Sequence, residues 1–153
     1  FPLGFETAEG KIAQAAKALE DGADEIESVI NLNHLKDHKY NLIHEELKQL
    51  RELLGDKTLK VIVEMQTIDD SEKASIAKVL EENKVDFIKT STGFSTSGAT
   101  FDDIALFKKY VGENVKIKAA GGISSFDDAK KFIELGADRL GTSRLVKIAK
   151  AEA

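Results

Sequence analysis

Amphipathic helical segments and short apolar runs alternate along this chain, and this order constrains the fold more than any other feature. Helices are expected over residues 9–19, 40–54, 71–83, 101–111 and 124–136. Strands are expected over residues 25–31, 59–64, 85–90, 115–119 and 137–141. Strict alternation of helix and strand implies right-handed crossovers and a parallel sheet.

Two architectures are compatible with such a sheet, an open doubly wound sheet and a closed barrel of eight units. No glycine-rich dinucleotide loop follows the first strand, which favours the barrel. A complete barrel needs about 250 residues and eight strands. This chain has 153 residues, room for five full strands, with residues 1–4 as a candidate end of a sixth. We therefore expect residues 1–153 to form one α/β domain, an incomplete (β/α)8 barrel of TIM type.

The composition argues against several functions. The formal net charge is −5 and the basic residues are scattered, which argues against nucleic-acid binding. The chain has no cysteine, so disulfides and zinc–thiolate sites are excluded. No apolar run approaches the roughly 18 residues of a membrane-spanning helix, so we expect a cytoplasmic protein with no membrane partner. Because the chain begins at Phe1 and its only methionine is Met65, we also expect a fragment or processed product.

Two lysines follow apolar residues at the ends of neighbouring strands. Lys89 ends the run at 86–89, and Lys118 lies at a comparable height in the next strand. At the C-terminal mouth of a barrel, two ammonium groups disfavour each other's charge, and desolvation acts in the same direction. One amine is then expected to be neutral near pH 7, as nucleophilic attack on a carbonyl requires. The spacing alone is equally compatible with two lysines that extend to water.

Glycines occur at the ends of the last two strands. Gly121 and Gly122 precede a capped helix, and residues 141–143 (GTS) follow the final strand. Glycines let a backbone approach an anion closely, and a helix N-terminus supplies N–H donors and positive potential. Because the loops after the last two strands are the usual phosphate site of a barrel, these segments predict phosphate binding. Ordinary turn glycines are the alternative.

Two carboxylates lie on the predicted strands. Glu27 belongs to the strand at 25–31, and Glu64 ends the strand that carries Lys60. Simple alternation places Lys60, Ile62 and Glu64 on one face. An inward carboxylate near the lysine pair can shuttle protons, and a surface or structural ion pair is the alternative.

Several segments together resemble one known family. Residues 87–94 (FIKTSTGF) resemble the Schiff-base strand of deoxyribose-phosphate aldolases. Residues 118–122 (KAAGG) and 139–143 (RLGTS) are similar to that family's second lysine strand and its final strand. Residues 1–4, 22–26 and 60–64 resemble further segments in the same order, so the resemblance covers the whole chain.

The resemblance implies a class I aldolase that needs no metal or other cofactor. Its reaction is cleavage of 2-deoxy-D-ribose 5-phosphate to D-glyceraldehyde 3-phosphate and acetaldehyde. Lys89 corresponds to the imine-forming lysine, Lys118 to its partner in proton relay, and Glu27 to the relay carboxylate. The resemblance also implies a set of phosphate contacts: Gly93, Gly121, Gly122, Gly141 and Ser143. The expected partner is a small phosphorylated sugar, and a homo-oligomer is an open alternative.

Three features depart from the family pattern. Glu27 stands in place of an aspartate, and a displacement of about an ångström can reduce a rate about 100-fold. Lys116 replaces a small residue and would add charge to the barrel interior. The first two strands and most of the third are missing, so the strands at 25–31 and 137–141 are expected to form exposed edges.

These departures leave two alternative functions. One is a catalytically inactive barrel fragment that folds or oligomerises through its open sheet edges. The other is a different phosphate-binding barrel enzyme, such as an isomerase or another Schiff-base aldolase.

Overall fold

The computed structural model describes residues 1–152, which are built around one parallel five-stranded sheet. The strands are β1 (Glu25–Val29), β2 (Thr58–Ile62), β3 (Phe87–Lys89), β4 (Lys116–Ala120) and β5 (Arg139–Gly141). Their spatial order follows their sequence order, β1-β2-β3-β4-β5. Within the described residues, β1 and β5 therefore each pair on one side only. The predicted open edges and the incomplete parallel barrel are confirmed.

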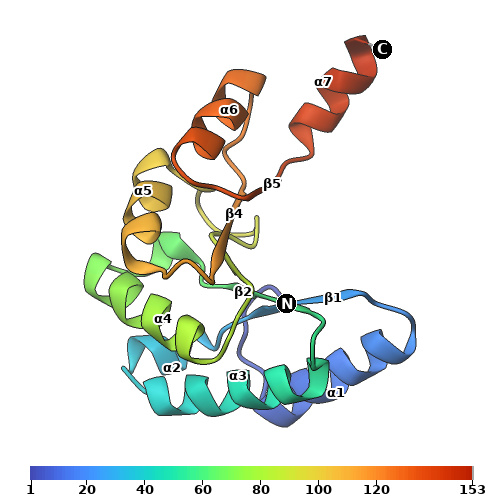
Figure 1. The fold of residues 1–153 in the computed structure, drawn as a ribbon, viewed down its shortest axis with the longest axis vertical. Coiled ribbons are helices and arrows are strands. Elements are labelled where there is room, and N and C mark those ends of the chain that lie inside the picture. The colour runs from blue at the N-terminus through green and yellow to red at the C-terminus, as the bar shows by residue number, and fades with distance from the viewer. Residues whose placement is uncertain (153) are drawn as a thin grey trace.

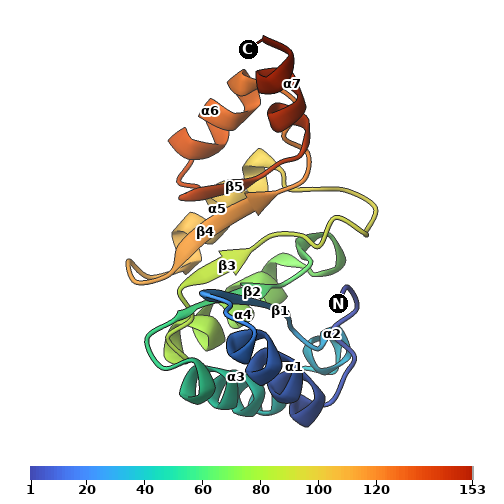
Figure 2. The same ribbon diagram turned by 90° about the vertical axis from the view of Figure 1, so that its right-hand side faces the viewer.

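The helices cover one face of the sheet and leave the other face open. They are α1 (Ala8–Glu20), α2 (Leu32–Lys36), α3 (Tyr40–Leu54), α4 (Asp70–Glu82), α5 (Phe101–Tyr110), α6 (Phe126–Glu134) and α7 (Arg144–Glu152), with a 3-10 turn η1 at Met65–Thr67. Figure 1 shows α4, α5 and α6 along the convex side of the curved sheet. Figure 2 looks toward the other side, with β4 and β5 in front of α5. The concave face is the one that would line the inside of a complete barrel.

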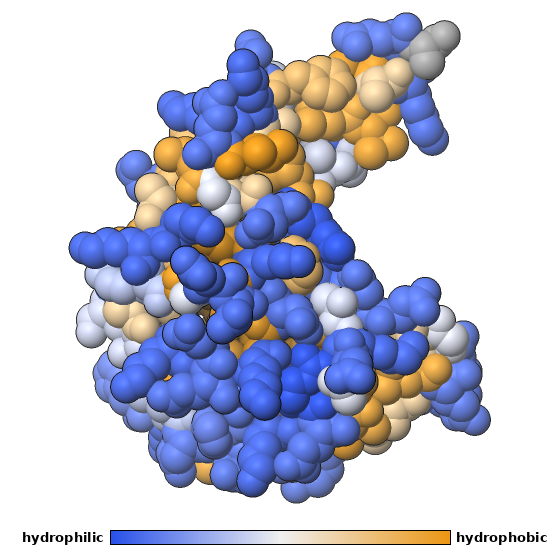
Figure 3. All heavy atoms as spheres, viewed as in Figure 1, coloured by the Kyte–Doolittle hydropathy of each residue, from blue (hydrophilic) through white to orange (hydrophobic). Residues whose placement is uncertain are grey.

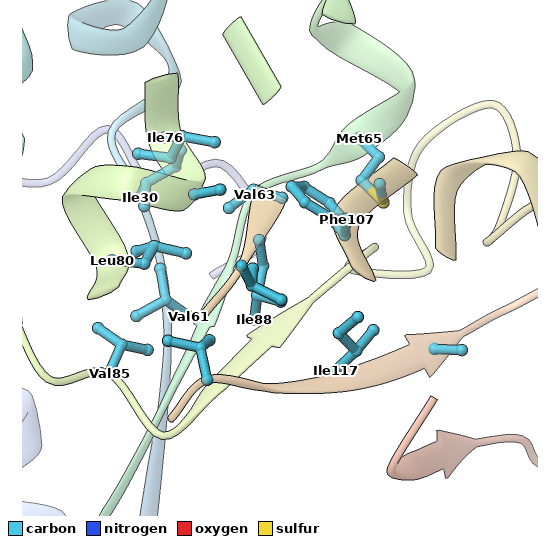
Figure 4. Packing of buried hydrophobic residues seen from close by; sticks show 14 of the residues in the cluster. Ile30, Val61, Val63, Met65, Ile76, Leu80, Val85, Ile88, Phe107 and Ile117 are labelled. Atoms are coloured by element: carbon cyan, nitrogen blue, oxygen red, sulfur yellow. The ribbon is translucent and has the colours of Figure 1, made fainter. Parts of the chain in front are cut away.

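Alternation within the strands separates the core from this concave face. Val61, Val63 and Ile88 point toward the helices and have no exposed surface, and Figure 4 shows them packed with Leu80 and Phe107. Burying one such aliphatic side chain contributes about 1.5–3 kcal/mol. Because one face of each strand is tied into this core, the opposite face can carry charged residues without loss of the strand.

Helix capping fixes where three of the loops end. Ser125 accepts from the N–H of Asp128 at 3.0 Å while the Asp128 carboxylate accepts from the Ser125 N–H at 3.1 Å, a reciprocal capping box at the start of α6. The predicted capping pattern at this helix is therefore confirmed. Equivalent boxes begin α4 and α5. Each such cap contributes about 1 kcal/mol.

The structure differs from the sequence-based expectation at several boundaries. β1 ends at Val29 instead of residue 31, because the side chain of Asn31 accepts from the N–H groups of Asn33 and His34 and begins the short helix α2. Residues 1–4 form no strand. Neither α2 nor α7 was predicted, although Leu145 and Ile148 have the helical spacing that would have indicated α7.

Side chains of the first and last strands meet across the concave face. Arg139 on β5 donates from Nη1 to Glu25 Oε2 on β1 at 2.8 Å. Lys60 on β2 donates to the same carboxylate. The sheet is thus curved strongly enough for its two edges to interact, as in a barrel, although the described residues do not close one.

Candidate active site

Two lysines and one carboxylate form a cluster on the concave face. Lys89 and Lys118 are paired in register between β3 and β4, so their side chains leave the sheet side by side. Glu27 lies on β1, two strands away from Lys89, and reaches the pair because the sheet is curved. Lys89 Nζ donates to Glu27 Oε2 at 2.6 Å, and Lys118 Nζ donates to Glu27 Oε1 at 2.8 Å. One carboxylate therefore bridges both amines.

The protonation of Glu27 follows from its two partners. Burial of the carboxyl group raises its pKa, but hydrogen bonds and charge from Lys118 and Lys89 outweigh burial, so the pKa of Glu27 lies below its ordinary value. Glu27 is therefore ionised near neutral pH. The sequence-based expectation considered only repulsion between the two lysines, whereas the structure places a negative charge between them. The longer side chain of Glu27, compared with an aspartate, spans this distance without difficulty.

A cleft of about 450 Å³ opens above this cluster. Its walls are the loops that follow β3, β4 and β5, and both Lys89 and Lys118 lie in its floor. All of the residues predicted to contact phosphate line it: Gly93, Gly121, Gly122, Gly141 and Ser143. Figure 3 shows that the outline of the molecule is hollowed on this open side, between α7 and the N-terminal helices. The structure thus brings the predicted lysines and glycines to one place.

The glycine pair after β4 is required by close packing as well. Gly121 and Gly122 have φ values of 75° and 72°, which disfavour any side chain. A Cβ atom on Gly121 would lie 2.9 Å from Gly98 Cα, and one on Gly122 would lie 2.8 Å from Ala99 O. The loop between β3 and α5 therefore passes directly over this pair. The glycines allow that approach and at the same time expose backbone to the cleft.

Glu64 does not end the strand that was predicted to contain it, because β2 stops at Ile62. Alternation placed it on the same face as Lys60, but the structure places it beyond the end of β2, with its carboxylate bound to Thr92. Glu64 is 4% exposed and bonds to neither lysine of the cluster. It is a support for the loop after β3 and not a partner of the lysine pair.

A second charged layer lies beneath the lysine cluster. Glu25 accepts from Arg139 and Lys60, and these hydrogen bonds lower the pKa of Glu25 to about 2. The guanidinium of Arg139 lies 4.6 Å from the ring centroid of Phe87, and Lys116 Nζ lies 5.6 Å from it. Lys116 therefore shares the concave face, as its position in the strand predicted. The pairing of Glu25 with Arg139 was not predicted, because 114 residues separate the two in the sequence.

Further cleft residues escaped prediction because they have no distinctive motif of their own. They are hydroxyl residues and one arginine beside the predicted glycines: Ser91, Thr92, Ser124, Thr142 and Arg144. Among residues 1–152, no three His, Asp or Glu side chains are grouped so that they could hold a metal ion.

Comparison with known proteins identifies the family. The model of the DeoC/LacD family aldolases matches residues 4–150. The chain belongs to this family. Membership makes it an aldolase, a carbon–carbon lyase, with a barrel-type fold of which part is present here.

Named relatives agree with this assignment. A deoxyribose-phosphate aldolase of Clostridium botulinum is 52% identical over 152 residues, which are 99% of this chain and 69% of the relative. A deoxyribose-phosphate aldolase of Streptococcus pyogenes is 52% identical over 153 residues, again 69% of its length. This chain therefore spans about two thirds of the length of these relatives.

Solved structures share the fold. The structure described as "QR15, an Aldolase" superposes with a TM-score of 0.93 at 39% identity and covers 99% of this chain and 69% of the other. A tetrameric deoxyribose phosphate aldolase from Aeropyrum pernix superposes with a TM-score of 0.88 at 30% identity, over 99% and 64% of the two chains. No helix within residues 1–152 is long and apolar enough to cross a membrane.

Proposed function

We propose that this chain cleaves 2-deoxy-D-ribose 5-phosphate to D-glyceraldehyde 3-phosphate and acetaldehyde through an imine on Lys89. The observation that carries the proposal is the Glu27 carboxylate bridging Lys89 and Lys118 at 2.6 and 2.8 Å. A nucleophilic lysine needs a nearby group that removes its proton, and later steps need a group that returns a proton to the reacting atoms. This arrangement supports both transfers.

The proposed reaction assigns a part to each of the three groups. The unprotonated Lys89 amine attacks C1 of the open-chain sugar, and water leaves to form a protonated imine. The imine nitrogen then accepts the electron pair of the C2–C3 bond while a base removes the proton of the 3-hydroxyl group. Glyceraldehyde 3-phosphate departs, the enamine gains a proton at C2, and hydrolysis releases acetaldehyde. Glu27 and Lys118 are the proposed proton carriers, since both lie within hydrogen-bonding range in the cluster.

In this proposal the phosphate of the substrate binds at the wall of the cleft that the loops after β4 and β5 form. Gly121 and Gly122 present backbone there, and Ser143 precedes α7. Backbone N–H groups and a helix N-terminus are favourable partners for a dianion. Gly141 carries no side chain, and even a Cβ atom there would lie 3.5 Å from Lys118 Cε, so the position beside this lysine is open.

We extend the proposal to the domain organisation, location and assembly of the chain. Residues 1–153 act as a single partial barrel domain in the cytoplasm, and copies associate, as the solved Aeropyrum pernix relative is described as a tetramer. A second candidate is an inactive fragment that associates through sheet edges. The one-sided pairing of β1 and β5 within the described residues favours it.

Borohydride trapping separates the two candidates. The folded chain is incubated with 2-deoxyribose 5-phosphate and borohydride, and peptides are then analysed by mass spectrometry. We expect an adduct on the peptide that contains Lys89 and none in Lys89→Ala. Lys60→Met serves as the matched control, because Lys60 is an equally buried lysine outside the cleft, and should keep the adduct. No adduct in a folded sample, or an adduct elsewhere, contradicts the proposal; an inactive oligomer in sedimentation supports the fragment.

A further inference from the structure

A strained and buried glutamate lies beneath the loop that follows β3. Glu64 has φ 48° and ψ 63°, in the left-handed region that such residues rarely adopt. Its side chain is buried, and it lies outside the residues that line the substrate cleft. Backbone strain of this kind persists only where the surroundings enforce it, and it concentrates at functional sites.

The strain arises from a bulge-like step at the end of β2. The N–H of Val63 donates to Lys89 O at 3.1 Å, and the N–H of Met65 donates to Thr90 O at 2.9 Å. From the first of these bonds to the second, the chain moves two residues after β2, from Val63 to Met65, but only one residue after β3, from Lys89 to Thr90. Glu64 is therefore the extra residue, as in a β-bulge. This step interrupts the alternation of the strand and turns the Glu64 side chain toward the β3–α5 loop.

The Glu64 carboxylate holds the turn in which this loop begins. The N–H of Thr92 donates to Glu64 Oε1 at 3.2 Å, and the Thr92 hydroxyl donates to Glu64 Oε2. The same hydroxyl accepts from the N–H of Phe94 at 3.1 Å. Between these two residues lies Gly93, which has φ 90° and lines the cleft. One carboxylate thus restrains both sides of a cleft-lining glycine.

A neighbouring side chain supports the same loop at two other points. Gln66 lies in η1, and its Nε2 donates to Ser91 Oγ and to Ser97 O, both at 2.5 Å. Ser91 in turn donates to Thr90 Oγ1 at 3.1 Å. The segment after β2 therefore supports the loop from its first residues to its middle. Among these contacts, Glu64 supplies the only carboxylate acceptor.

We propose that Glu64 is a positioning residue for substrate binding, which acts through Thr92 to hold Gly93 in the conformation that receives the substrate phosphate. The inference rests on the function proposed above, because it takes the cleft as the substrate site. Hydrogen bonds to an ionised acceptor are about twice as strong as neutral ones, so the carboxylate restrains the turn more firmly than an amide would. Glu64 touches none of the reacting atoms.

The test uses inorganic phosphate as the probe and the whole chain as the protein. Binding is followed through the backbone amide signals of Gly93 and Gly121 by NMR. Glu64→Gln is expected to raise the dissociation constant about tenfold, the effect of losing one charge-assisted hydrogen bond. Thr92→Val should raise it by a similar factor, and the double variant should show little further change, because both substitutions remove one interaction. Thr92→Ser keeps the hydroxyl and should restore the affinity.

A matched control distinguishes positioning from general destabilisation. Glu72 is as buried as Glu64, but it caps α4 and pairs with Lys36 away from the cleft. Glu72→Gln should lower stability and leave the phosphate dissociation constant unchanged. Thr92→Val retains the buried carboxylate and keeps the test valid if Glu64→Gln does not fold.

Trapping with acetaldehyde, which carries no phosphate, separates this inference from the proposed function. An unchanged adduct on Lys89 in Glu64→Gln, together with weakened phosphate binding, supports a positioning role. If the natural chain binds phosphate but forms no adduct, the imine mechanism fails and the positioning role stands. Unchanged phosphate affinity in both Glu64→Gln and Thr92→Val overturns the inference, as does the absence of phosphate binding at Gly93.

Discussion

Replacing Glu27 by glutamine tests the centre of the proposed mechanism with almost no change in shape. The substitution removes the negative charge shared by Lys89 and Lys118 and turns one acceptor oxygen into a donor. Hydrogen bonds to charged groups contribute about 1.5–3 kcal/mol each. The side chains of Lys89, Lys118 and Glu27 are 11%, 17% and 25% exposed. Water can therefore replace the lost hydrogen bond in part, and we expect the loss to lie near the lower end of this range.

The larger effect is on proton transfer. A positioned acid or base contributes about 10²- to 10⁴-fold to a rate, and glutamine can neither accept nor return a proton. We therefore expect Glu27→Gln to slow the trapping of 2-deoxyribose 5-phosphate on Lys89 by at least about 100-fold, a barrier increase of about 2.7 kcal/mol. Phosphate affinity should change little, because Glu27 does not line the phosphate wall of the cleft.

The assay is the initial rate of borohydride trapping, measured by intact-protein mass at fixed substrate concentration. Glu25→Gln is the matched control, since Glu25 lies on the same strand and face as Glu27 but bonds to Lys60 and Arg139 instead of the lysine pair. Its trapping rate should stay within about threefold of the natural chain, far from the effect of losing a proton carrier. A Glu27→Gln rate that also stays within this range would refute proton transfer through Glu27.

Two further predictions concern stability. The folded pKa of Glu25, about 2, lies below its ordinary value of about 4.3. Its ion pairs therefore stabilise the fold above about pH 4.3, and this stabilisation is lost as the pH falls toward 2. Urea unfolding between about pH 5 and pH 2 should show a smaller loss of stability in Glu25→Gln than in the natural chain, and parallel curves would count against this. Lys11 Nζ donates to Glu46 at 2.8 Å, and both side chains are buried. Lys11→Met leaves the buried carboxylate without its partner and should lower the free energy of unfolding by about 3 kcal/mol, whereas the double variant Lys11→Met with Glu46→Leu should regain most of this loss. Equal losses in the single and double variants would contradict the reasoning.

Periodicity and short motifs predict those parts of the fold that depend on neighbours in sequence. The order of helices and strands follows from apolar spacing, and the neighbouring positions of Lys89 and Lys118 follow from two consecutive strands in parallel register. The capping of α6 by Ser125 follows from a local pattern. Each of these features involves residues within one helix, one strand or one β–α–β unit, where alternation and capping are reliable guides.

The tertiary structure alone decided the features that depend on curvature and on an interrupted strand. Glu27 meets Lys118 across 91 positions of sequence and Glu25 meets Arg139 across 114, because the sheet curves until its edges face each other. Glu64 lies beyond the end of β2 because a bulge-like step breaks the regular pairing after Ile62. The sequence by itself therefore determined the parallel α/β order and the two lysines. Which carboxylate joins them was decided by the curvature of the sheet, a property of all five strands together.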